Sequence, residues 1–78
     1  MTVYRYSCVE APTNLVLFRE ESSELQPLIA RFEEPLDKAY LMKVAKEHTK
    51  AEGVVVSVEE RTETSDWREI RHSYEFLY

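Results

Sequence analysis

Hydrophobic and polar positions alternate near the N-terminus of this chain, as they do in a strand with one face turned toward a core. Tyr4, Tyr6 and Cys8 share one side of this alternation. After a turn-forming stretch that contains a proline, residues 15–19 make a second short apolar run. We therefore predict a β-hairpin over residues 2–19.

The C-terminal part of the chain repeats this pattern. The valine-rich residues 54–58 predict a strand, and the polar residues 62–66 predict the turn that follows it. Alternation then returns over residues 67–78, with His72 on the apolar side. These segments predict a closing hairpin in which His72 is a hydrogen-bonded core histidine.

The segment between the two hairpins is harder to interpret. Residues 25–32 are mostly apolar, but Pro27 interrupts them, so they fit either a third strand or a brief helical turn. A strand is the preferred interpretation.

Residues 35–52 carry the helical pattern. Pro35 suits the first turn of a helix, and Gly53 is predicted to end the helix in the left-handed conformation. Apolar side chains recur at three- and four-residue steps in this segment, which predicts one buried face. They are Leu36, Tyr40, Leu41, Val44, His48 and Ala51.

Together these segments predict a single α+β domain over residues 1–78. Its order is ββ(β)αββ, with a mostly antiparallel sheet and one helix, about residues 35–52, packed on one face. Because one helix covers one sheet face, the opposite face is expected to be open to a partner.

Composition limits the function classes. The chain has 78 residues, 15 of them acidic and 10 of them lysine or arginine, and a formal net charge of −5. This balance disfavours general adhesion to nucleic acid or anionic lipid. The lone cysteine excludes an intramolecular disulfide, and the sequence shows neither a signal peptide nor a membrane-spanning run. The expected location is the cytoplasm, or the host cytoplasm if the protein is viral.

All lysines of the chain fall within the predicted helix and on the side away from its apolar face. They are Lys38, Lys43, Lys46 and Lys50. Such a ridge can contact phosphates or an acidic protein, and the alternative is an ordinary solvated helix surface. Lys43, Lys46 and Lys50 are therefore candidate partner-binding residues.

A second candidate surface lies at the start of the last strand. Trp67, Arg68 and Arg71 have the residue types that dominate protein interfaces, and we expect them near the open sheet face. The alternative for Trp67 is packing over the end of the sheet.

Catalytic chemistry has little support in the sequence. Cys8 could pair with His48 or His72 only if the fold brought them together, and no segment resembles a nucleophile turn. No metal-ligand spacing or glycine-rich phosphate loop is present. We therefore expect neither an enzyme nor a cofactor.

The leading hypothesis is a small acidic protein-binding module that acts by contact, such as an adaptor or a phage-type anti-defence inhibitor. One alternative is a nucleic-acid-binding protein that uses the basic helix face. Another is a structural homodimer subunit, because a thin core is often completed by self-association.

Overall fold

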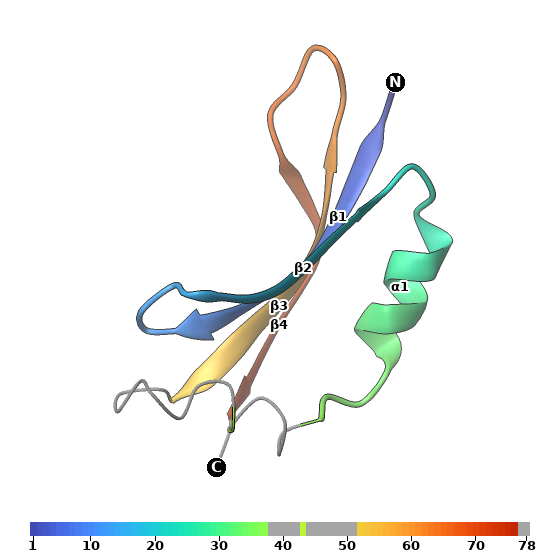
Figure 1. Ribbon diagram of the computed structural model, residues 1–78. Helices are drawn as coiled ribbons and strands as arrows, with labels where there is room; N and C mark the ends of the chain where they lie inside the picture. The colour runs from blue at the N-terminus through green and yellow to red at the C-terminus, as the bar shows by residue number, and fades with distance from the viewer. Residues whose placement is uncertain (38–42, 44–51, 77–78) are drawn as a thin grey trace.

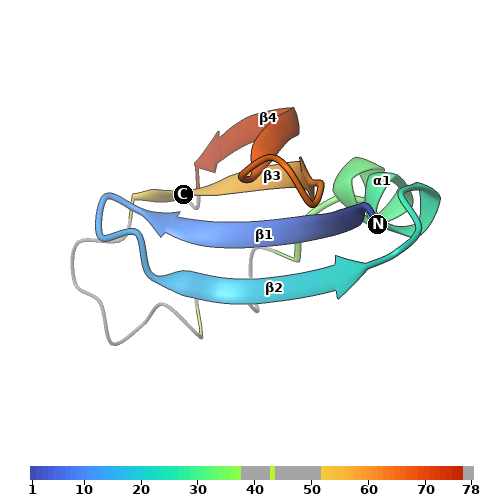
Figure 2. The same ribbon diagram turned by 90° about the horizontal axis from the view of Figure 1, so that it is seen from above.

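Four antiparallel strands form one sheet, and a helix lies on one side of it (Figure 1). The computed structural model describes residues 1–37, 43 and 52–76. The elements are β1 (Val3–Ala11), β2 (Val16–Ser22), α1 (Gln26–Glu33), β3 (Gly53–Arg61) and β4 (Arg68–Phe76). The strand order across the sheet is β2-β1-β3-β4, as Figure 2 shows from above. The predicted α+β class with an antiparallel sheet is confirmed.

Both predicted hairpins are present. β1 pairs with β2, and β3 pairs with β4, each in antiparallel register. The β1–β2 turn is closed by two backbone hydrogen bonds of 2.8 Å, from the N–H of Glu10 to the carbonyl of Leu15 and from the N–H of Asn14 to the carbonyl of Glu10. Asn14 takes a φ of 63°, a left-handed conformation that asparagine tolerates better than most residues.

The preferred strand over residues 25–32 is wrong, because this segment forms α1. Pro27 stands in the first turn of the helix, where its missing N–H removes no intrahelical hydrogen bond. Leu25, Leu28, Ile29 and Phe32 recur at three- and four-residue steps and contact the core, and Leu36 contacts it from beyond the C-terminal end of the helix. The alternative prediction for residues 25–32, a brief helical turn, is closer to the structure, in which the helix has eight residues.

Gly53 also differs from its prediction. It is the first residue of β3, and its φ is not in the left-handed region. A Cβ atom on Gly53 would lie 2.5 Å from the carbonyl oxygen of Glu75 and 2.6 Å from the hydroxyl of Tyr74. The glycine is required because the ring of Tyr74 and the neighbouring backbone of β4 approach its Cα closely.

Most of the predicted helix over residues 35–52 lies outside the described residues, His48 included. Within it, residues 35–37 have no regular secondary structure, and Lys43 is exposed.

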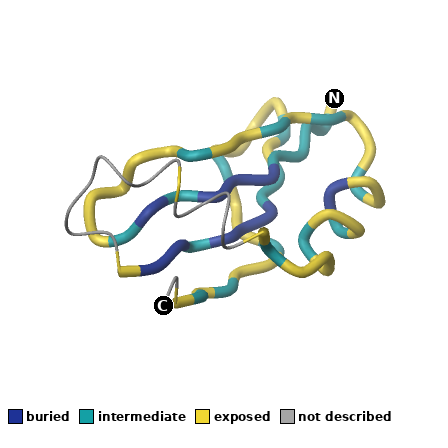
Figure 3. Tube along the Cα trace, turned by 60° about the horizontal axis from the view of Figure 1, so that its bottom comes forward, coloured by how far each residue is buried: buried dark blue, intermediate teal, exposed yellow. Residues whose placement is uncertain are grey.

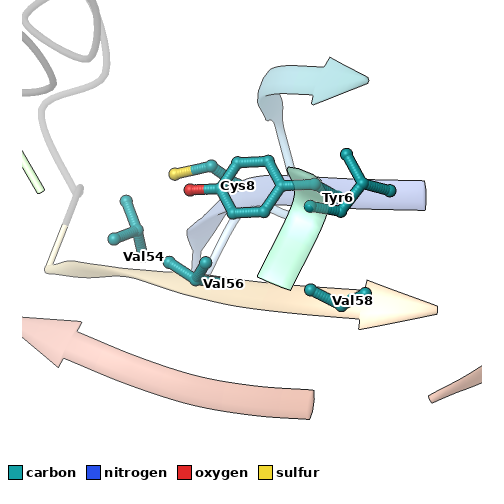
Figure 4. Packing of buried hydrophobic residues seen from close by; sticks show 6 residues of the cluster. Tyr6, Cys8, Val54, Val56 and Val58 are labelled. Atoms are coloured by element: carbon teal, nitrogen blue, oxygen red, sulfur yellow. The ribbon is translucent and has the colours of Figure 1, made fainter. Parts of the chain in front are cut away.

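The core lies between the sheet and α1. Tyr6 and Cys8 of β1, Leu28 of α1, and three valines of β3 are buried together (Figures 3 and 4). The valines are Val54, Val56 and Val58. Burying one such aliphatic side chain contributes about 1.5–3 kcal/mol to the free energy of folding. The stability of the sheet therefore depends on a small number of buried side chains. This cluster fixes which face of each strand points inward.

Candidate interaction face

Strand register separates the two faces of the sheet. Cross-strand partners share a face. Tyr6 lies opposite Val58, and Cys8 opposite Val56, so these residues define the core face that α1 covers. The alternate residues of each strand define the other side, which we call the outer face. No helix in the described part of the chain covers the outer face (Figure 1).

An apolar row crosses the outer face through all four strands. Val16 of β2 lies opposite Val9 of β1, Val9 opposite Val55 of β3, and Val55 opposite Tyr74 of β4. Val16 and Tyr74 are 42% and 41% exposed, and the two central valines are half-buried. Phe76 extends the row; its ring centroid is 5.1 Å from that of Tyr74, and the residue is 65% exposed. We call these five residues the apolar row.

Two serines occupy the centre of the outer face beside the apolar row. Ser7 and Ser57 are cross-strand partners, and both are buried. The Nε–H of Arg19 donates to the Oγ of Ser7 at 3.1 Å. His72 lies opposite Ser57 and is exposed, so it is not the predicted core histidine.

A charged cluster occupies the other end of the outer face. The Nη2 and Nε of Arg5 donate to one oxygen of Glu59 at 2.9 and 3.2 Å, and both side chains are largely buried. The guanidinium carbon of Arg5 lies 4.0 Å from the ring centre of Trp67, and that of Arg61 lies 5.2 Å from it. A half-buried Arg–aromatic stack of this kind is worth about 1 kcal/mol or more. Trp67 therefore packs over the end of the sheet, as the alternative prediction proposed.

Arg68 and Arg71 do not join Trp67 on the outer face. Arg68 lies opposite Glu60 and forms an ion pair with it, and Arg71 lies opposite the core residue Val58. Both arginines therefore point to the core side of β4, where they are exposed. The expected Trp67–Arg68–Arg71 grouping on the open face is wrong.

The three candidate lysines give no described surface. Lys43 is exposed, and Lys46 and Lys50 lie outside the described residues.

Cys8 and His72 are not a nucleophile–base pair, because they lie on opposite faces of the sheet. Burial raises the pKa of the Cys8 thiol above 9.0, which favours the unreactive protonated form. Burial is also the main reason that the pKa of Tyr6 is raised above 10.0, with a smaller contribution from Cys8. Among the described residues, no group of three or more histidine, cysteine or acidic side chains could hold a metal ion.

The apolar row is not apparent from the amino-acid sequence. The alternation marked Tyr74 and Phe76 as apolar, but it placed them toward the core. Nothing in the sequence gave the cross-strand register that brings Val16, Val9 and Val55 into line with them.

The chain matches no protein-family model, and no curated protein or solved structure is significantly similar to it. None of the helices in its described part has the length and apolar character needed to cross a membrane.

Proposed function

We propose that this chain is a protein-binding module that acts without catalysis, through the apolar row on its outer face. The observation that carries the proposal is the exposure of this row: Val16, Tyr74 and Phe76 are each more than two-fifths exposed on a face that no described helix covers. Adaptors and inhibitors both work by contact of this kind.

The position of the row supports binding more than chance exposure. Single apolar residues scattered over a surface are ordinary, but a contiguous apolar strip with a polar border is typical of interaction sites. Here the strip spans the width of the sheet, and the serines and Arg19 border it. A partner that covers this strip would gain about 25 cal/mol of binding free energy for each Å² of apolar surface removed from water.

Arg19 indicates the chemistry of the partner. Its Nε is held by Ser7, which fixes the guanidinium beside the apolar row. Within the described part of the chain, no carboxylate forms an ion pair with Arg19. A guanidinium that is held in place by one hydrogen bond can still bind a carboxylate through its remaining N–H groups. The expected partner surface therefore combines apolar side chains with a neighbouring aspartate or glutamate.

β2 offers a matched pair of substitutions to test this function. Val16 and Phe18 are both 42% exposed, but Phe18 lies opposite Cys8 on the core side, where its ring meets Tyr6. Val16→Ser and Phe18→Ser each remove an equally exposed apolar side chain from opposite faces of one strand. Each variant, and the natural chain, would be used as bait in lysate of the source cells.

The proposal predicts that one protein binds the natural chain and Phe18→Ser in comparable amounts, and that Val16→Ser recovers about tenfold less of it. Circular dichroism would establish that both variants are folded. Equal recovery on Val16→Ser, or no stoichiometric partner on any bait, would overturn the proposal.

A further inference from the structure

β4 is a long, exposed edge of the sheet. It has nine residues, it pairs only with β3 in the described part of the chain, and it ends the strand order. Most of its side chains are exposed. An edge strand with free backbone groups accepts another strand unless its side chains prevent the pairing.

The charges of β4 are self-complementary in one register. In antiparallel pairing of two copies about Ser73, Arg71 of each copy lies opposite Glu75 of the other, and His72 lies opposite Tyr74. β4 is in unbroken register with β3 over residues 71–76, so these positions lie on a regular strand. Arg71 and Glu75 point to the same face, since their β3 partners are the core residues Val58 and Val54.

Neighbouring registers that keep the faces aligned lack this match. Centring the pair on His72 places Glu69 opposite Glu75, and centring it on Arg71 or Glu75 opposes like charges directly. Centring it on Tyr74 places Glu75 opposite Ser73. Opposite charges across a strand pair are favourable and like charges are unfavourable, so the Ser73 register is selected.

The local state of Arg71 fits this pairing. Its Nη1 donates to the carbonyl of Ile70 at 3.2 Å, and no carboxylate forms an ion pair with it in the described part of the chain. Glu75 does interact within its own chain. A carboxylate has about four lone-pair sites, so it can also accept from a second copy.

β2, the other edge, does not offer such a match. Pairing two copies about Glu20 places Arg19 opposite Glu21 but opposes the two Glu20 carboxylates directly, and pairing about Arg19 opposes the two arginines.

We propose that two copies of this chain pair through β4, antiparallel about Ser73, and form one continuous eight-stranded sheet. The partner is thus a second copy, joined by backbone hydrogen bonds and two Arg71–Glu75 pairs. Tyr74 and Phe76 of the apolar row lie on β4, but the contact is made by backbone hydrogen bonds and by Arg71 and Glu75 on the core side of that strand, so it does not rest on the proposed function. It would place two apolar rows on the same side of the joined sheet.

Sedimentation velocity on the natural chain and on charge variants tests the proposal. The natural chain is expected to dimerise, with a larger dissociation constant at high salt. Arg71→Glu and Glu75→Arg each turn two attractive pairs into two repulsive ones, and each is expected to raise that constant by about tenfold or more. The double variant Arg71→Glu/Glu75→Arg restores opposite charges in both pairs and is expected to dimerise again.

Circular dichroism on each variant would separate loss of pairing from loss of folding. A natural chain that stays monomeric at high micromolar concentration would overturn the proposal, and so would a dimer that Arg71→Glu leaves unchanged. Failure of the double variant to dimerise, while it is folded, would also overturn it. Because Val16 is on the opposite edge strand, Val16→Ser should dimerise normally, so the two proposals can fail separately.

Discussion

At the scale of single residues, Glu10 is the least expected feature of the core side. It is fully buried opposite Val54, and neither carboxylate oxygen has a hydrogen-bond partner among the residues that the structure describes. Burying a polar group without a partner costs free energy, and an ionised one costs more. The sequence places Glu10 at the end of a strand next to a turn, where a glutamate is usually solvated. Its face follows from the alternation that places Tyr6 and Cys8 on the core side, but the depth of its burial is seen only in the folded chain.

Replacement of this carboxylate should therefore stabilise the fold. Glu10→Met keeps a similar volume without the charge, and we expect it to raise the free energy of unfolding by about 1–3 kcal/mol. Glu10→Gln should give a smaller gain, since it removes the charge but keeps an unpaired polar group. Urea unfolding of the three proteins measures both effects. A marked loss of stability in Glu10→Met would contradict the absence of a partner for Glu10.

The buried thiol and phenol predict how stability depends on alkaline pH. The pKa values of Cys8 and Tyr6 are raised in the folded chain above their ordinary 9.0 and 10.0. Above those values the unfolded chain loses protons that the folded chain retains, so stability is full below pH 9 and falls as the pH rises beyond it.

Cys8→Ala should remove the part of this fall that begins near pH 9, although it lowers stability overall by leaving a small cavity. Unfolding measured from pH 7 to pH 11 would show a flatter profile for the variant than for the natural chain. Parallel profiles would mean that the Cys8 thiol ionises as readily in the folded chain as in the unfolded one.

At the scale of elements, both hairpins were correctly predicted, from alternation in β1 and β4 and from apolar runs in β2 and β3. The apolar side of β4 was assigned to the wrong face, because Tyr74 and Phe76 lie on the outer face and not on the core. The same reasoning failed for residues 25–32. Pro27 does not interrupt a strand; it stands in the first turn of α1. The contacts of Leu25, Leu28 and Phe32 with the core show that a three- and four-residue period was present. A segment as short as α1 carries too few periods to separate a helix from a strand without its tertiary contacts.

Leu28 gives the clearest test of how much α1 contributes. It is the only residue of α1 in the buried cluster and is 1% exposed. Leu28→Ala should lower the free energy of unfolding by about 2–5 kcal/mol, because it removes buried methyl groups and leaves a cavity. Ala30→Ser, at an exposed position of the same helix, is the control and should change stability by about 0.5 kcal/mol or less. Equal stability of the two variants would mean that α1 does not pack on the sheet.

At the scale of the whole molecule, the sequence predicted an open sheet face but not which residues lie on it. Trp67 was expected to act there with Arg68 and Arg71, and the register divides them between the two faces. The shift between Val58 and Glu59 changes the pairing where β4 begins, and simple alternation cannot anticipate such an irregularity. The apolar row depends on three separate strand registers, so it becomes visible only in the assembled sheet.

The central claim is that the outer face binds another protein, and site-specific photo-crosslinking tests it most directly. A photoreactive phenylalanine derivative at Val16 stands on the apolar row and away from the β4 edge, and the same group at Ala30 on α1 is the control. After irradiation in the source cells, we expect the Val16 probe to form an adduct with a different protein and the Ala30 probe to form none. The same adduct from both positions, or an adduct from Ala30 alone, would contradict the claim.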